Sequence, residues 1–168
     1  MQQLLILRHA KAVPWSCTAE DFPRKLDRAG VDHARRVANW ICLELDPPQS
    51  ILCSPSQRTR ETLAPLLAMQ PALEAVSRFV PQIYNGTLAT LETLLDSAFA
   101  AADRVLIVGH NPGFEELLGN VIHPGHYAEF SRLPTGTLAV VEFEPDWASG
   151  HGSGALRHFI RGKHLPLD

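Results

Sequence analysis

The stretch that decides the fold is Leu4-Leu5-Ile6-Leu7, followed directly by Arg8-His9-Ala10-Lys11. An apolar run bounded by charge predicts a buried parallel strand. The carboxyl end of such a strand is where open α/β sheets bind ligands. Histidine is a nucleophile with a pKa near neutrality, and arginine presents a planar fork that matches phosphate oxygens. Arg8 and His9 therefore indicate a histidine that accepts a phosphoryl group. For this segment alone, a strand that merely ends in two polar residues stays the stronger alternative.

A second apolar run turns into a polar segment, and the two read Ile51-Leu52-Cys53 and Ser54-Pro55-Ser56-Gln57-Arg58. We expect a strand followed by a helix, with Ser54 as N-cap, Pro55 at the first helical position and Gln57 closing a capping box. The free N–H groups at the start of this helix attract anions, and Arg58 in the first turn adds a full charge. Arg60 lies roughly 200° farther around the helix and is expected in solvent.

A third apolar run ends in glycine and histidine, and it reads Val105-Leu106-Ile107-Val108-Gly109-His110. Asn111 follows as a candidate N-cap and Pro112 as the first residue of a helix. Strands of the same sense in a parallel sheet gather their carboxyl ends on one edge. We therefore expect two arginines and two histidines from the three segments to surround a phosphate. A capped core histidine is the structural alternative for His110, and the other two segments make it the weaker one.

The three segments, in order along the chain, read Leu7-Arg8-His9-Ala10-Lys11, Ser54-Pro55-Ser56-Gln57-Arg58-Thr59-Arg60-Glu61-Thr62 and Val108-Gly109-His110-Asn111-Pro112. In this order they resemble the histidine phosphatase (phosphoglycerate mutase-like) superfamily. The short chain and the wording Arg-His-Ala-Lys resemble its small SixA-type phosphohistidine phosphatase branch. The similarity runs from Leu4 to about Leu118.

This resemblance implies a fold and a set of roles. The fold is α/β, a single domain over residues 1–168 with three α/β/α layers and a mainly parallel central sheet. His9 is the phosphate-accepting nucleophile, and the phosphate ligands are Arg8, Arg58 and His110. Arg24 resembles a further arginine of the small branch that lies just before the first helix, with a solvated loop residue as the alternative. Ser54 and Asn111 complete the candidate substrate-binding residues.

The region where many members of the superfamily place a general acid holds no carboxylate. It reads Phe79-Val80-Pro81-Gln82-Ile83-Tyr84-Asn85-Gly86. Gln82, Tyr84 and Asn85 are candidates to line the pocket, but none is a convincing acid at neutral pH. Glu92 comes later, inside an expected helix, and is expected on the surface.

The missing acid bears on the substrate. An alkoxide leaving group is very basic and needs a proton as it departs. A phosphorylated imidazole can carry its proton on the other ring nitrogen, and it then leaves as neutral imidazole, whose conjugate acid has a pKa of roughly 6.5. Phosphohistidine therefore suffers less from weak acid assistance than phosphoserine or a sugar phosphate. Acyl and aryl phosphates are feasible for the same reason.

The composition limits which classes of partner and which cellular compartment we expect for the protein. The formal net charge of −3 argues against a general nucleic-acid binder, whose footprint is basic. The sequence holds no long apolar span and no signal-like start, so we expect neither a membrane span nor export. The cysteines are few, odd in number and without paired spacing, which is typical of reduced thiols in a cytoplasmic protein.

Several other histidines raise the question of a metal. His123 and His126 stand close together, and His151 follows. No cysteine or carboxylate stands at a standard zinc spacing, and there is no His-Glu-x-x-His helix. We interpret these residues as a polar loop near the pocket mouth and expect no metal and no other cofactor. The signatures of dinucleotide, nucleoside triphosphate and serine hydrolase sites are missing as well.

The rest of the chain alternates between helical and strand patterns. Helices are expected over 26–45, 55–67, 88–95 and 114–118. A weaker strand is expected over 75–80, and residues 136–143 and 155–160 predict a late hairpin at a sheet edge.

These observations predict a metal-independent phosphatase with a covalent intermediate on His9. The expected substrate is phosphohistidine on a protein, such as a histidine-containing phosphotransfer domain, with phosphate or other oxyanions binding in the same site. A small-molecule phosphomonoesterase is the alternative among enzymes. A non-catalytic module that binds phosphate or phosphohistidine is the alternative from another class.

Overall fold

The computed structural model describes residues 1–17, 19–149 and 151–166. Its strands are β1 (Gln2–Arg8), β2 (Ser50–Cys53), β3 (Ser77–Phe79), β4 (Arg104–Gly109), β5 (Thr137–Phe143) and β6 (Ala155–Arg161). Its α-helices are α1 (Arg28–Glu44), α2 (Gln57–Met69), α3 (Leu88–Phe99) and α4 (Gly113–Val121). Short 3-10 helices are η1 (Trp15–Cys17), η2 (Pro71–Val76), η3 (Pro81–Ile83), η4 (Pro124–Glu129), η5 (Trp147–Ser149) and η6 (Gly162–His164). The alternation of strands and helices expected from the sequence is confirmed.

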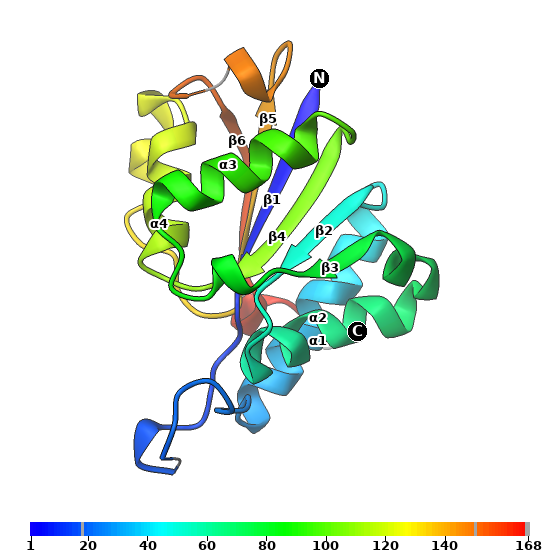
Figure 1. Cartoon of the computed structure of the whole chain (residues 1–168), viewed down its shortest axis with the longest axis vertical. Helices are drawn as coiled ribbons and strands as arrows, with labels where there is room; N and C mark the ends of the chain where they lie inside the picture. Colours follow the sequence, from blue (N-terminus) through cyan, green and yellow to red (C-terminus); the bar gives the residue numbers. More distant parts are fainter. Residues whose placement is uncertain (18, 150, 167–168) are drawn as a thin grey trace.

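One six-stranded sheet runs through the molecule in the order β3-β2-β4-β1-β5-β6 (Figure 1). The first four strands are parallel, and β5 pairs antiparallel with both β1 and β6. The mainly parallel sheet and the late hairpin at its edge are therefore confirmed. In the register of the parallel strands, Arg8 stands opposite Gly109 and Cys53 opposite Val108. Because these strands end together, the residues that follow them meet at one edge of the sheet.

Helices cover both faces of the sheet, which gives the three layers predicted. Side chains along a strand alternate between the faces. On β1, Leu5 and Leu7 belong to a buried cluster with residues of α1 and α2. Leu4 and Ile6 belong to a second buried cluster with residues of α3 and α4. Since the central strand is apolar on both faces, the polar residues Arg8 and His9 come where the core ends. No helix among the described residues is both long enough and apolar enough to cross a membrane.

The predicted start of α2 is wrong by two residues. The helix begins at Gln57, with Ser56 in the N-cap position and no side-chain cap bond, so neither the Ser54 cap nor the capping box exists. The reason is that the Ser54 backbone still belongs to the sheet edge, where its N–H donates to Val108 O at 3.0 Å. Pro65 lies inside the helix and does not end it.

The predicted start of α4 is also wrong. The helix begins at Gly113, and Pro112 rather than Asn111 holds the N-cap position. The Asn111 side chain does not cap the helix because its amide donates to Glu115 Oε2 at 2.7 Å and to Leu133 O at 2.9 Å.

The loop between β1 and α1 extends beyond the carboxyl ends of the strands (Figure 1). Its second half, residues 19–26, is here called the strap. The strap is attached at its end by a bridge between Ala12 and Leu26, and in its middle by the Gln57 N–H, which donates to Phe22 O at 3.1 Å. This bond occupies a free N–H at the start of α2, one of those expected to hold the anion.

Candidate active site

Three strand ends bring the predicted catalytic residues together. The His9 N–H donates to Gly109 O at 3.0 Å, which ties the end of β1 to the end of β4. The imidazole rings of His9 and His110 lie 5.3 Å apart between centroids, and both residues are buried. Gly109 packs directly against Phe114, where a Cβ would stand 2.6 Å from the ring.

His9 has the geometry of a neutral nucleophile. Its Nδ1 lies 2.7 Å from the Ala10 carbonyl oxygen. A carbonyl only accepts, so Nδ1 carries the hydrogen and Nε2 keeps the lone pair. Burial lowers the pKa of His9 to about 3, and the Ala10 bond opposes that shift only partly. The imidazole is therefore neutral at physiological pH, which is the form that attacks phosphorus.

His110 is held by the hydroxyl of Ser54. Its Nε2 lies 2.8 Å from Ser54 Oγ. Burial, followed by the charge of Arg58, lowers the pKa of His110 to about 4. When Nε2 accepts the Ser54 proton, Nδ1 carries a hydrogen and can donate to an oxyanion. Ser54, expected as a substrate-binding residue, contacts His110 through this hydroxyl.

The two arginines of the site approach it from different elements. Arg8, at the end of β1, donates through Nη1 to Leu133 O at 3.0 Å. Arg58, in the first turn of α2, is 5% exposed. Arg60 is exposed, as predicted, and its Cζ stacks 3.9 Å from the ring centroid of Phe79.

Three donors of this site lack a partner. Among the described residues, Nε of Arg8, Nε of Arg58 and Nδ1 of His110 are buried with no hydrogen bond. Buried polar groups are normally paired, because leaving one unpaired costs about 1–3 kcal/mol. Three such groups on three neighbouring residues mark the place where an oxyanion would complete the hydrogen bonds.

Asp21, on the strap, is a site residue that the sequence reasoning missed. Its Oδ2 accepts from Arg58 Nη2 at 3.0 Å and from the Tyr84 hydroxyl at 2.5 Å. Its backbone carbonyl accepts from Arg58 Nη1 at 3.0 Å. The strap thus holds the guanidinium of Arg58 from the side opposite the sheet.

Arg24 and Tyr84 complete this second side of the pocket. Arg24 donates to Asp21 Oδ1 through Nε and Nη2, at 3.3 and 3.1 Å, so it belongs to the cluster rather than to open solvent. The Tyr84 ring lies 5.4 Å from the ring of His110 and 5.2 Å from that of Phe22. Of the residues proposed to line the pocket, Tyr84 faces the histidine, Asn85 lies beside it in a cavity of 250 Å³, and Gln82 is exposed.

Asn111 lies on the Arg8 side of the pocket. Its amide and the Arg8 guanidinium donate to the same acceptor, Leu133 O. Both residues line a cavity of 750 Å³ that also holds Arg132 and Arg161. Asn111 is therefore placed to position Arg8.

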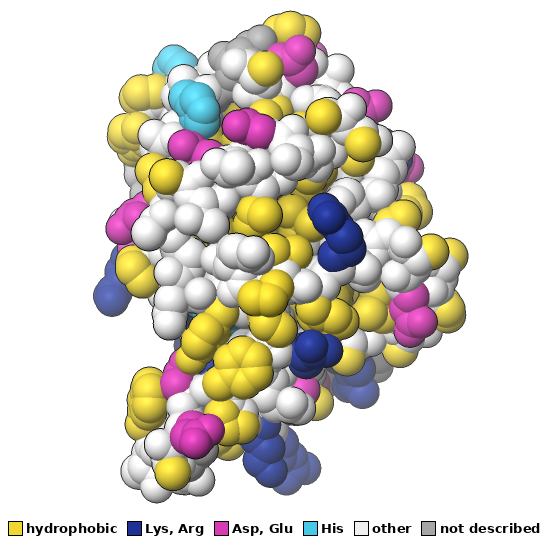
Figure 2. Space-filling view, in the orientation of Figure 1, with side chains coloured by type: hydrophobic (Ala, Val, Ile, Leu, Met, Phe, Trp, Pro, Cys, Tyr) yellow, Lys and Arg dark blue, Asp and Glu magenta, His cyan; other side chains and the backbone are white. Residues whose placement is uncertain are grey.

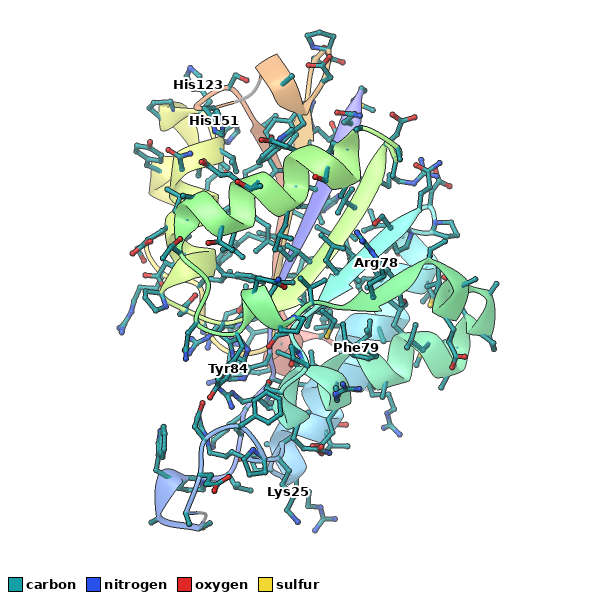
Figure 3. The ribbon with its side chains drawn as sticks, in the orientation of Figure 1. Lys25, Arg78, Phe79, Tyr84, His123 and His151 are labelled. Carbon is teal, nitrogen blue, oxygen red and sulfur yellow. The ribbon has the colours of Figure 1, made fainter. Side chains whose placement is uncertain are left out.

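Glu92 does not supply the missing acid. It lies on α3, where its Oε1 accepts from Asn120 Nδ2 at 2.6 Å and stands 3.4 Å from His151 Nδ1. In Figure 3, His151 lies at the opposite end of the molecule from Tyr84. The carboxylate is therefore engaged away from the phosphate pocket.

His123, His126 and His151 are the histidines that raised the question of a metal. His123 and His151 lie at the far end from Tyr84 (Figure 3), so the expectation of a polar loop near the pocket mouth is wrong for them. His126 pairs with Glu129 at 3.3 Å. Within residues 1–17, 19–149 and 151–166, no group of three candidate ligands could hold a metal ion.

Comparison with known sequences finds uncharacterised relatives. No family model matches the chain. A chloroplast protein of Arabidopsis thaliana is 32% identical over 124 residues, which cover 68% of this chain and 56% of that protein. The chain thus spans just over half the length of this relative. A protein of Mycobacterium tuberculosis is 26% identical over 169 residues, covering 95% of this chain and 99% of the relative.

Solved structures place the fold. A protein assigned as the phosphohistidine phosphatase SixA from Agrobacterium tumefaciens is 28% identical, with a TM-score of 0.81 over 95% of this chain and 97% of that one. A protein histidine phosphatase SixA complexed with tungstate matches with a TM-score of 0.80 at 23% identity, over 96% and 97% of the two chains. The alpha-ribazole phosphatase from Shigella flexneri is more distant, with a TM-score of 0.68 at 14% identity over 99% and 100%. With its paired histidines and arginines at the shared sheet edge, the chain has the fold of these histidine phosphatases and is similar to the SixA-type proteins among them.

Proposed function

We propose that this protein is a phosphatase that removes the phosphoryl group from phosphohistidine through a covalent intermediate on His9. The observation that carries the proposal is the geometry of His9. Its Nδ1 is tied to the Ala10 carbonyl, so Nε2 presents a lone pair beside unpaired donors from Arg8, Arg58 and His110. A nucleophile surrounded by donors matches a phosphoryl group, which spreads its charge over its equatorial oxygens.

The charge of the phosphate is met by side chains. Arg8 and Arg58 carry fixed positive charges, and His110 offers a neutral donor. Arg24 stands behind Arg58 in the Asp21 cluster. Because these cations occupy the place where a divalent ion would otherwise neutralise the phosphate, the proposed reaction is metal-independent.

The reaction proceeds in two displacements. In the first, Nε2 of His9 forms a bond to phosphorus while the bond to the leaving group breaks, and its electron pair goes to the departing atom. In the second, the oxygen of water forms a bond to phosphorus while the P–N bond breaks and its electron pair returns to Nε2 of His9. The imidazole is neutral again, and the protons of the water stay on the departing phosphate or pass to solvent. The donors around the pocket stay in place through both steps, so no reorganisation is needed as charge develops.

The rim of the pocket suits a protein as substrate. The side chains of Trp15, Phe22 and Phe79 are exposed by 60%, 44% and 41%. The Phe22 ring packs against the ring of Tyr84, which lines the pocket. The Trp15 ring centroid lies 5.2 Å from Arg24 Cζ. Figure 2 shows hydrophobic side chains gathered on the lower part of the face that it views. Exposed apolar side chains around a site favour a macromolecular partner, such as a histidine-containing phosphotransfer domain.

The test compares leaving groups. We expect phosphohistidine peptides and activated aryl phosphates to be cleaved well, and phosphoserine and sugar phosphates poorly, because the region where many histidine phosphatases place a general acid, residues 79–86, holds no carboxylate. One transferred proton is typically worth ~10²–10⁴-fold, so kcat/KM should differ by at least that order. Equal kcat/KM for phosphoserine and phosphohistidine peptides would contradict the absence of an acid. Phosphate binding without turnover of any substrate would identify a non-catalytic reader, and preference for a small phosphate ester would identify a phosphomonoesterase.

A further inference from the structure

Asp21 is an ionised carboxylate placed where no carboxylate is needed to bind phosphate. Burial would raise the pKa of Asp21, but hydrogen bonds from Tyr84, Arg58 and Arg24 outweigh this and hold it below its ordinary value. A carboxylate in this state does not donate a proton at physiological pH. It therefore cannot replace the missing general acid, and a negative charge beside a phosphate site requires another explanation.

Asp21 is linked to the pocket by two residues that it contacts, Tyr84 and Arg58. Tyr84 donates to Asp21 Oδ2, and its ring packs edge-on against His110. Arg58 donates to the carboxylate through Nη2 while its unpaired Nε belongs to the phosphate pocket. The negative charge of Asp21 also raises the proton affinity of His110, although the burial of that imidazole and the charge of Arg58 outweigh it.

The groups that face Asp21 are known on each side. Arg24 comes from the strap itself, Arg58 from α2 and Tyr84 from the segment after η3. Across the pocket stand the end of β1, with Arg8 and His9, and the end of β4, with His110. Glu115 and Glu116 lie farther along, lining the cavities beside Arg8 and His110. Removing the Asp21 charge therefore removes the carboxylate that is bonded to Arg58 and Tyr84.

The negative charge of Asp21 has opposite effects on two kinds of leaving group. When the P–N bond of a protonated phosphoimidazole breaks, the electron pair goes to the departing nitrogen and neutral imidazole leaves, with its proton on the other nitrogen. When the P–O bond of an ester breaks, the electron pair goes to oxygen, which becomes anionic. A nearby carboxylate stabilises the protonated imidazole before the bond breaks and opposes the anionic oxygen as it forms.

We propose that Asp21 is a specificity-determining residue, whose negative charge keeps the leaving imidazole of phosphohistidine protonated and disfavours phosphate esters. The proposal rests on the proposed phosphohistidine phosphatase function. It explains why a site without a general acid keeps a carboxylate at its mouth. The carboxylate holds a proton that the substrate already carries, so the enzyme supplies none.

The test is the Asp21→Asn variant, measured with phosphoimidazole and with 4-nitrophenyl phosphate. Both are small, so docking of a partner protein does not enter. We expect the ratio of kcat/KM for phosphoimidazole to that for the aryl phosphate to fall roughly 10- to 100-fold, on the order of one unit charge acting across a pocket. The pH above which phosphoimidazole turnover declines should also move downward in the variant. A residue that only positions Arg58 would lower both substrates in parallel and leave the pH profile in place.

Two further variants keep the test decisive. Asp21→Glu retains the charge and should preserve the substrate preference, even where its absolute activity falls. Tyr84→Phe removes one donor to the carboxylate but no charge, so the ratio should change less than threefold. If Asp21→Asn and Asp21→Glu lose preference equally, charge is not the cause and the proposal is overturned. Wild-type protein that turns over neither substrate would instead refute the phosphatase function itself.

Discussion

The two sides of the pocket are built in different ways. On one side, Arg8 ends β1, His9 follows it, and His110 follows β4. Both strands are buried over most of their length. On the other side, Asp21, Arg24 and Tyr84 come from segments without strand pairing, and they are joined to each other by charge and hydrogen bonds. Arg58 is the residue that both sides share.

This difference separates two tasks. A side chain at the end of a buried strand inherits the rigidity of the core, which suits groups that must be aligned with phosphorus. A strap held by polar contacts depends on the charges that pair along it, which suits groups that select among substrates. We therefore expect the sheet side to determine whether the reaction occurs, and the strap side to modulate it.

The sheet side is tested most severely by His9→Ala. We expect turnover to fall at least about 10⁴-fold while the protein stays folded, because no other side chain is placed to take the phosphoryl group. Acid quenching of a brief reaction should trap acid-labile, base-stable phosphate on wild-type protein only. Substantial activity in a folded His9→Ala variant would remove the mechanism.

The contributions of the two sides are compared by measuring kcat/KM in Arg58→Ala and in Arg24→Ala, because Arg58 belongs to both sides and Arg24 to the strap side alone. Both substitutions remove a partner of Asp21, but Arg58 also carries a buried Nε that has no hydrogen bond among the described residues. We expect a loss of roughly 10²–10³-fold in kcat/KM for Arg58→Ala, the size typical of a donor to developing charge. Arg24→Ala should cost less than about tenfold. Equal losses in the two variants would mean that the strap itself binds the phosphate.

The sheet side was accessible to prediction because its signals are local. Leu4 to Leu7 and Val105 to Val108 are unbroken apolar runs, and the polar residues after them had to stand at a strand end. Arg58 was separable from Arg60 by helical geometry alone, and the structure agrees. What failed there was detail at helix starts, where Ser54 and Asn111 are used by tertiary contacts instead of capping.

The strap side was missed because its contacts join residues far apart in sequence. Asp21 meets Arg58 across 37 positions and Tyr84 across 63, and no periodicity reports such pairs. A signal was nevertheless present. The sequence placed several arginines near one phosphate, and a buried arginine requires a counter-charge, so a carboxylate close to Arg24 was a fair candidate. Tyr84 was named as a lining residue, but its bond to Asp21 was not foreseen.

The buried histidines of the sheet side predict how stability depends on pH. His9 and His110 have folded pKa values of about 3 and 4, below the ordinary 6.5. The unfolded chain therefore binds protons that the folded chain does not, and stability falls as pH drops below 6.5. At pH 5 the loss is about 2 kcal/mol for each histidine. Urea unfolding at pH 7 and pH 5 measures it, and His9→Ala should lose about 2 kcal/mol less than wild type between the two pH values. Identical losses in both proteins would mean that His9 is not held neutral by the fold.

Metal removal is expected to change kcat/KM least of all. The expectation depends on the arginines of both sides of the pocket. Arg8 from the sheet side and Arg58, backed by Arg24 on the strap side, already supply the positive charge that a divalent ion would bring to phosphate. We therefore expect kcat/KM to change less than about twofold after exhaustive treatment with EDTA. The matched control is His123→Ala with His126→Ala, which alters the other candidate ligands without touching the pocket. The contrary result is an activity that falls on chelation, returns with zinc or magnesium, and no longer responds to chelation in the double variant. That result would mean that the arginines of the two sides do not suffice to neutralise the phosphate.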